Sequence, residues 1–237
     1  MSKPHIEIKT KQLGYFLLRC TVPLLLRLFF RFRIEGSENV PRHGPCIVIS
    51  NHLSHLDSFA IGIGAYFRTF HFMADSKMFK LPVLGKLIPK LNAFPIWKGS
   101  KDIAGIKYNV LLVKAGKATV YYPEGHRSRS GKLHPGKIGV GWLLRETEVP
   151  FTPCILLNIG KAMPSGKGLR LGGGPRKLEL VIHFGQPVLL SKYFKMPKTK
   201  ETAGMIRDEV MKVLESEQKR TVADYNRRLT RRSDRDK

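Results

Sequence analysis

Short apolar runs alternate with polar and glycine-containing stretches along the chain, and the spacing within them predicts strands separated by helices. The predicted strands cover residues 46–50, 70–74, 93–97, 118–122, 151–158 and 178–184. Helical periodicity predicts helices that begin near residue 59 and cover 102–115, 137–145 and 200–220, with a proline-broken helix over 76–91. Strands that alternate with helices indicate the α/β class, with a mainly parallel sheet flanked by helices.

The stretch from residue 13 to residue 32 has a different pattern, dense in Leu, Phe and Val but interrupted by arginines. Its longest uncharged run, 20–26, is far shorter than the roughly 20 residues of a membrane-spanning helix. Arg19, Arg27 and Arg31 are spaced by multiples of four, so on a helix they share one stripe. With Phe29 and Phe30 among the surrounding apolar residues, the pattern is typical of an amphipathic helix in a membrane interface. The alternative is a helix packed on the protein's own core.

These patterns divide the chain into three parts. Residues 1–33 form the expected amphipathic membrane-anchoring segment, and residues 34–220 form one folded domain that begins with a connector. Residues 221–237 are highly charged and are expected to form a flexible tail.

Composition adds two constraints. The formal net charge of +24 indicates an anionic partner, which is nucleic acid, anionic lipid or a phosphorylated substrate. No recognisable nucleic-acid-binding motif accompanies the basic residues. The three cysteines are odd in number and form no CxxC pair, which favours a reducing compartment over a disulfide framework.

The candidate chemistry lies at the carboxyl end of the predicted strand 46–50, in the sequence Asn-His-Leu-Ser-His-Leu-Asp (51–57). A polar cluster between a buried strand and a helix is where α/β proteins place their sites. His52 can act as a general base near neutral pH, and Asp57 can orient its imidazole. Two alternatives remain open at this point: His52 caps the helix and Asp57 is a solvated acid of its first turn, or His52, His55 and Asp57 bind a metal ion.

Three further segments follow in an informative order: FPIWKG at 94–99, YPEGHRS at 122–128 and VPFTPCIL at 149–156. Together with the His-Asp stretch, they resemble the four conserved blocks of the glycerolipid acyltransferases, over roughly residues 46–156. In length and layout the chain is most similar to the bacterial lysophosphatidate (1-acylglycerol-3-phosphate) acyltransferases. The resemblance implies an acyltransferase domain over 34–220 and a membrane anchor formed by the N-terminal helical segment.

The resemblance also implies a reaction. A fatty acyl group would move from a thioester, acyl-CoA or acyl carrier protein, to the free sn-2 hydroxyl of lysophosphatidic acid, which makes phosphatidic acid for phospholipid synthesis without a cofactor. His52 and Asp57 would be the catalytic pair. The acceptor phosphate would be bound by Lys98, Glu124, Gly125 and Arg127. Asn51, Pro123, Ser128 and Pro150 would support the motifs.

The expected partners are therefore anionic membrane lipids, lysophosphatidic acid and the thioester donor, with no nucleic acid. The expected location is the cytoplasmic face of the inner cell membrane, as a monotopic protein. Two positions depart from the family pattern: His126 stands where the family usually has Thr, and Lys98 where it often has Arg. Two other classes remain as alternatives, a basic nucleic-acid-binding protein and a zinc hydrolase that adds His134 or His183 to the metal ligands.

Overall fold

The computed structural model describes residues 21–235 apart from 22–23, 25, 83, 97–102, 165–167 and 171–177. Its centre is a seven-stranded sheet in the order β1-β7-β6-β2-β5-β3-β4. The strands are β1 (Arg31–Glu35), β2 (Cys46–Ser50), β3 (Phe70–Asp75), β4 (Ala93–Ile96), β5 (Ala118–Tyr121), β6 (Phe151–Leu157) and β7 (Glu179–Phe184). Neighbouring strands are parallel except for the antiparallel pair β6 and β7, so β1 and β7 run opposite to the other five.

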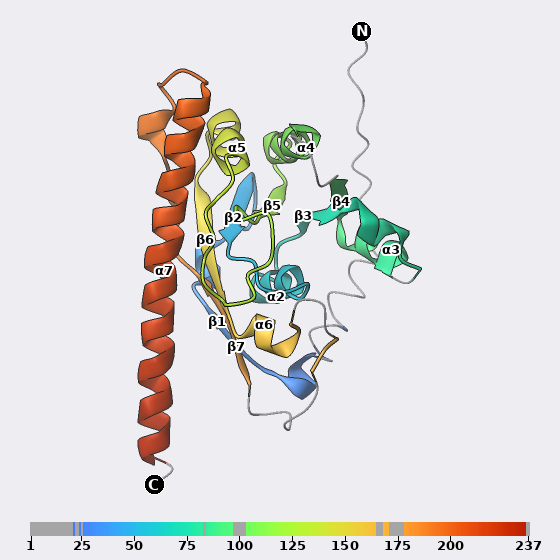
Figure 1. The fold of residues 1–237 in the computed structure, drawn as a ribbon, viewed down its shortest axis with the longest axis vertical. Helices are drawn as coiled ribbons and strands as arrows, with labels where there is room; N and C mark the ends of the chain where they lie inside the picture. Colours follow the sequence, from blue (N-terminus) through green and yellow to red (C-terminus); the bar gives the residue numbers. More distant parts are fainter. Residues whose placement is uncertain are drawn as a thin grey trace.

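Helices cover both faces of this sheet (Figure 1). One face carries α4 (Ile103–Lys114), α5 (Gly139–Thr147) and α7 (Lys200–Arg235), and the other carries α2 (Asp57–Gly64) and α6 (Ile159–Ala162). The alternation of side chains along a strand explains the two cores. In β2, Ile47 and Ile49 pack under α5 and α7, while Cys46 and Val48 face α2. The expected mainly parallel sheet with flanking helices is therefore present.

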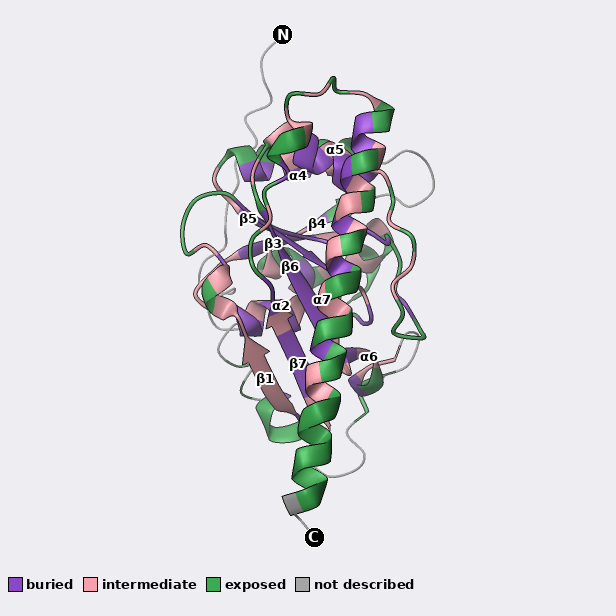
Figure 2. Ribbon diagram, turned by 90° about the vertical axis from the view of Figure 1, so that its left-hand side faces the viewer, coloured by how far each residue is buried: buried purple, intermediate pink, exposed green. Residues whose placement is uncertain are grey.

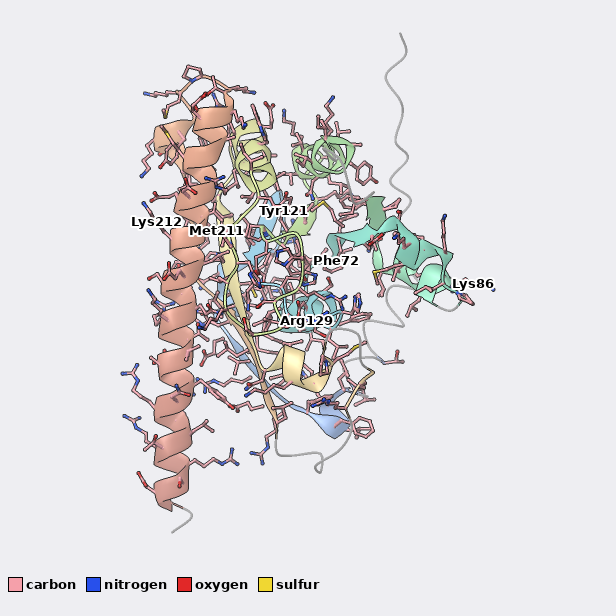
Figure 3. All side chains as sticks on the ribbon, viewed as in Figure 1. Phe72, Lys86, Tyr121, Arg129, Met211 and Lys212 are labelled. Atoms are coloured by element: carbon pink, nitrogen blue, oxygen red, sulfur yellow. The ribbon has the colours of Figure 1, made fainter. Side chains whose placement is uncertain are left out.

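The long helix α7 is amphipathic only over its first half. Val210 and Leu214 are fully buried against the sheet, and Figure 3 shows Met211 pointing toward the sheet while Lys212 points away from it. Figure 2 shows the lower end of this helix in the colour of exposed residues, which here are residues 226–234. Residues 221–235, expected to be a flexible tail, instead continue the helix to Arg235. Elongation of an already docked helix needs no new nucleus, which allows the helix to continue through this charged segment.

The N-terminal prediction needs a second correction. Arg31 and Arg33 lie in strand β1, so the anchor boundary placed at residue 33 falls inside an edge strand of the sheet. Phe30 is only 4% exposed and packs into the core with Leu26, as the core-packing alternative expected. Leu24, Leu28 and Phe29 are instead exposed by 65%, 59% and 38%. Arg19 lies outside the described residues.

The remaining differences are small. The proline-broken helix over 76–91 is resolved into the short segments Ser76–Lys80, α3 (Leu84–Leu87) and Ile88–Leu91. Cys46 and Cys154 are buried free thiols. No helix in the described part of the chain combines the length and the apolar character needed to cross a bilayer.

Candidate active site

The site begins where β2 ends, and Asn51 fixes the loop that follows. Its side-chain amide donates to the carbonyl oxygen of Leu156 at 2.9 Å, and its Oδ1 accepts from the N–H of Leu156 at 2.8 Å. The side chain thus pairs with β6 as a strand residue would, and it is 1% exposed. Asn51 therefore anchors the loop to the sheet.

His52 and Asp57 meet directly across the first turn of α2. The imidazole Nδ1 lies 2.6 Å from Asp57 Oδ2, and the same oxygen accepts from the backbone N–H groups of Leu53 at 2.6 Å and Ser54 at 2.9 Å. Asp57 is fully buried, whereas the His52 side chain is 21% exposed. If Nδ1 carries the proton donated to Asp57, Nε2 holds the free lone pair, which is the arrangement of an oriented general base.

Tyr122 supports the imidazole from one side. Its ring stacks on that of His52, with centroids 4.2 Å apart and an interplanar angle of 17°. Its hydroxyl lies 3.1 Å from the Ser58 hydroxyl. Burial, with the nearby charge of Asp57, raises the pKa of Tyr122 well above its usual value, so the phenol stays neutral. No local pattern in the sequence indicated this contact, because Tyr122 is 70 residues from His52 in the chain.

The loop that follows β5 packs against the His-Asp loop through Glu124. One carboxylate oxygen accepts from the backbone N–H of His52 at 2.9 Å, and the other accepts from the backbone N–H of His134 at 2.9 Å. The Ser128 N–H donates to the carbonyl oxygen of His52 at 2.7 Å. Glu124 is fully buried, and both of its carboxylate oxygens are occupied by backbone N–H groups. It joins two loops and holds the backbone of His52.

The outer part of the same loop is basic and accessible. Gly125 has a φ of +68°, a backbone conformation that favours glycine, and the flexible end of the Lys137 side chain lies 2.8 Å from where a Cβ would stand. Arg127 is half-buried and follows the exposed His126. The His126 ring contacts the His134 ring edge to face at a centroid distance of 4.8 Å. The cation Lys137 beside Gly125 was not predicted from the motif.

Of the other predicted site residues, the structure describes Pro123 and Pro150 but not Lys98. Pro123 is buried, and its carbonyl oxygen accepts from the Lys137 N–H at 2.8 Å. Pro150 is exposed immediately before β6. Lys98 lies outside the described residues, so the structure brings only Glu124, Gly125 and Arg127 of the expected phosphate-binding set to one loop.

The proposed metal ligands do not converge. His55 is exposed, and His183 contacts Glu35 and Glu217. Within the residues that the structure describes, no three His, Cys, Asp or Glu side chains gather as a metal ion would need.

Comparison with known proteins places this geometry in context. The acyltransferase family model matches residues 31–157, which is more than half of the chain. A chloroplastic 1-acyl-sn-glycerol-3-phosphate acyltransferase of Brassica napus is 29% identical over 77% of this chain and 52% of its own length. A 1-acyl-sn-glycerol-3-phosphate acyltransferase of Bacillus subtilis is 24% identical over 83% of this chain and 93% of its own length.

A solved structure has the same fold. The 1-acyl-sn-glycerophosphate (LPA) acyltransferase PlsC of Thermotoga maritima matches with a TM-score of 0.63 and 23% identity, over 88% of this chain and 83% of that one. The chain spans about half the length of the plant relatives it matches, 52% for the Brassica napus protein and 48% for one from Arabidopsis thaliana.

Proposed function

Because this chain belongs to the acyltransferase family, we propose that it transfers a fatty acyl group from a thioester to the free sn-2 hydroxyl of lysophosphatidic acid, forming phosphatidic acid. The observation that carries the proposal is the buried carboxylate of Asp57 held 2.6 Å from Nδ1 of His52. The names of the Brassica napus and Bacillus subtilis relatives support the choice of acceptor.

The proposed chemistry is a direct transfer. His52 Nε2 takes the proton of the acceptor hydroxyl as the oxygen attacks the thioester carbonyl carbon. The carbon–sulfur bond then breaks, and the imidazolium returns the proton to the leaving thiolate, so a free thiol and an ester are the products. Asp57 keeps the imidazole in the correct orientation and stabilises its transient positive charge. The co-substrate is acyl-CoA or acyl carrier protein, and the proposal needs no cofactor.

The acceptor's phosphate is proposed to bind on the loop after β5. Arg127 presents a planar guanidinium there that suits a phosphate in bidentate geometry. Lys98 is proposed to assist it, and Gly125 lets the backbone approach the ligand. Glu124 acts indirectly, because both of its carboxylate oxygens are bonded to backbone N–H groups.

The test is release of free thiol from an acyl thioester by the purified protein, over a panel of lysophospholipid acceptors. We expect activity to depend on lysophosphatidic acid and to be abolished in His52→Ala, while His55→Ala, three residues away and exposed, retains most of it. Near-parental turnover by a folded His52→Ala protein would overturn the mechanism. A preference for another acceptor would overturn the substrate assignment alone.

We further propose that the protein is monotopic on the cytoplasmic face of the inner cell membrane, where thioester donors are made. The exposed Leu24, Leu28 and Phe29 beside Arg27 support insertion into the headgroup and acyl boundary. Deletion through residue 33 would remove part of β1, so point variants test this better than truncation. Leu24→Gln with Leu28→Gln should reduce sedimentation with vesicles. Leu111→Gln on α4, where the leucine is similarly exposed, should not.

A further inference from the structure

The helix α7 extends well beyond its last buried residue. Thr221 is 3% exposed, but almost every later residue described is exposed or half-buried, and no core residue lies in this part. Residues 222–235 contain five arginines and two aspartates and span about 20 Å as a helix. We call this segment the C-terminal arm. It is a long, strongly basic helix that the core does not require.

The arginines of the arm lie on one side. Their positions, 227, 228, 231, 232 and 235, fall within roughly 140° of the helix circumference. Arg228 identifies that side, because its guanidinium reaches Glu35 at the end of β1 at 3.2 Å. The arginines therefore lie on the same face of α7 that packs on the sheet in its first half. At this end of the helix that face is turned toward β1, the edge strand of the sheet.

Strand β1 adds charge of the same sign to this surface. Phe32 and Ile34 pack toward the core on the α2 side of the sheet, so strand alternation turns Arg31, Arg33 and Glu35 toward α7. We call the combined surface the basic edge, made of Arg31, Arg33, Arg227, Arg228, Arg231 and Arg232. Glu35 pairs with Arg33 and Arg228, and Asp224 pairs with Arg227. Among the described residues, Arg31, Arg231 and Arg232 have no acidic partner.

The basic edge lies on the same side of the molecule as the candidate active site. His52 follows the carboxyl end of β2, and β1 runs opposite to β2, so the start of β1 is at that same edge of the sheet. Figures 1 and 2 show that α7 ends at the same, lower end of the molecule as the start of β1. The exposed Leu24, Leu28 and Phe29, just before β1, therefore lie at this end of the sheet, in a segment whose Leu26 and Phe30 pack on the α2 face. Figure 3 shows nitrogen-tipped side chains projecting from this end of α7.

We propose that the C-terminal arm and β1 form a docking surface for anionic membrane lipid, separate from the N-terminal apolar anchor, that presents the active-site edge of the sheet to the bilayer. Unpaired arginines and exposed leucines at the same end of the sheet fit a bilayer, where arginines contact headgroup phosphates while leucines enter the acyl layer. A nucleic acid would match the charge but would leave the leucines exposed to water. This proposal rests on the proposed function, which requires an acceptor taken from a membrane.

The test compares Arg231→Gln/Arg232→Gln with a control that removes the same charge elsewhere. Lys107→Gln/Lys114→Gln on α4 is suitable, because both lysines are exposed and Figure 1 shows α4 far from the end of α7. Glutamine preserves helix propensity in both variants. Binding is measured by sedimentation with vesicles of phosphatidylglycerol and phosphatidylcholine, and with phosphatidylcholine alone. Circular dichroism verifies that each variant is folded.

Each arginine near an anionic surface contributes about 1 kcal/mol, so we expect the arm variant to bind anionic vesicles about tenfold to thirtyfold more weakly at low salt. The control should change by less than about twofold, and turnover of a dispersed short-chain acceptor should be unchanged in both. Equal losses in the two variants, or no loss in the arm variant, would overturn the proposal. The proposal would also be overturned if the arm variant lost binding to duplex DNA but still bound anionic vesicles as the parent does. Failure of the proposed function would appear separately, as absent acyl transfer in the parent protein, because vesicle binding needs no turnover.

Discussion

At the scale of single residues, the candidate site depends on side chains that hold backbone rather than substrate. Asp57 accepts from two backbone N–H groups in addition to the imidazole, Glu124 bonds two loops, and Asn51 pairs with β6. Each of these side chains is buried, so its hydrogen bonds form in a low-dielectric environment. Removing one partner there would leave a buried donor or acceptor without a hydrogen bond, which lowers the stability of the fold. The position of His52 is thus determined by several buried polar contacts at once.

Asp57→Asn should reduce kcat by several orders of magnitude. An amide in place of the carboxylate favours the wrong imidazole tautomer and cannot stabilise the imidazolium, and loss of the acid in other such pairs costs about 10⁴ in kcat. Steady-state kinetics measure the effect, and circular dichroism shows whether the variant is folded. A folded Asp57→Asn protein with kcat within about tenfold of the parent would contradict the role of Asp57.

Arg127→Ala should raise the KM of the lysophosphatidate acceptor strongly while that of the thioester donor changes little. The guanidinium is the half-buried cation of the loop after β5, and under the proposed function it contacts the phosphate of the acceptor and no part of the donor. Arg129→Ala, the exposed arginine two residues on, is the matched control and should leave both KM values nearly unchanged. Equal changes in the two KM values of Arg127→Ala would indicate a structural role instead.

At the scale of elements, α5 and α7 approach each other closely at Gly141. A Cβ at Gly141 would lie 1.8 Å from the Ala203 carbonyl oxygen, so only glycine allows this approach of the two helices. The contact holds the first half of α7 on the sheet, from which the C-terminal arm extends.

Gly141→Ala should therefore destabilise the protein by at least about 1–3 kcal/mol, because the clash is with backbone that a rotamer change cannot relieve. Gly204→Ala is the control, next to the same contact on α7 but with no atom within 4 Å of its Cβ. It should stabilise by roughly 0.5–1 kcal/mol through helix propensity. Urea unfolding measures both, and a Gly141→Ala protein as stable as the parent would show that the helices can separate at no cost.

At the scale of the whole molecule, the net charge of +24 makes the few carboxylates important. Glu35 lies among Arg33, Arg228 and His183 and links strand β1 to α7. Partial burial raises the pKa of Glu35, but the hydrogen bond and charge of Arg33, with the charges of Arg228 and His183, outweigh it and the pKa is lowered.

A lowered pKa gives a definite pH dependence. Glu35 contributes its stability above its unfolded pKa, about 4.3, and the contribution is lost as the pH falls through the lower folded pKa. Glu35→Gln should thus be less stable than the parent at pH 7, with a difference that shrinks toward zero in acid. The control Asp208→Asn, an exposed carboxylate paired with its neighbour Arg207, should differ little from the parent at any pH. Urea unfolding over a pH series measures the free energy of unfolding of each variant. A stability difference between Glu35→Gln and the parent that does not change with pH would contradict the prediction.

The sequence alone determined the α/β class, most of the strands and helices between residues 46 and 220, and the candidate His52–Asp57 pair. Each of these is a local property, since periodicity is read over a few residues and the pair is only five residues apart. The tertiary structure decided what depends on distant segments: Glu124 holds His52 across 72 residues, and Asn51 pairs with Leu156 across 105. It also decided that Phe30 is buried while the adjacent Phe29 is exposed. It showed that α7 continues through residues that were expected, from their charge, to form a tail. Adjacent residues of similar hydrophobicity carry no local signal of which one meets the core, because burial depends on where the rest of the chain packs.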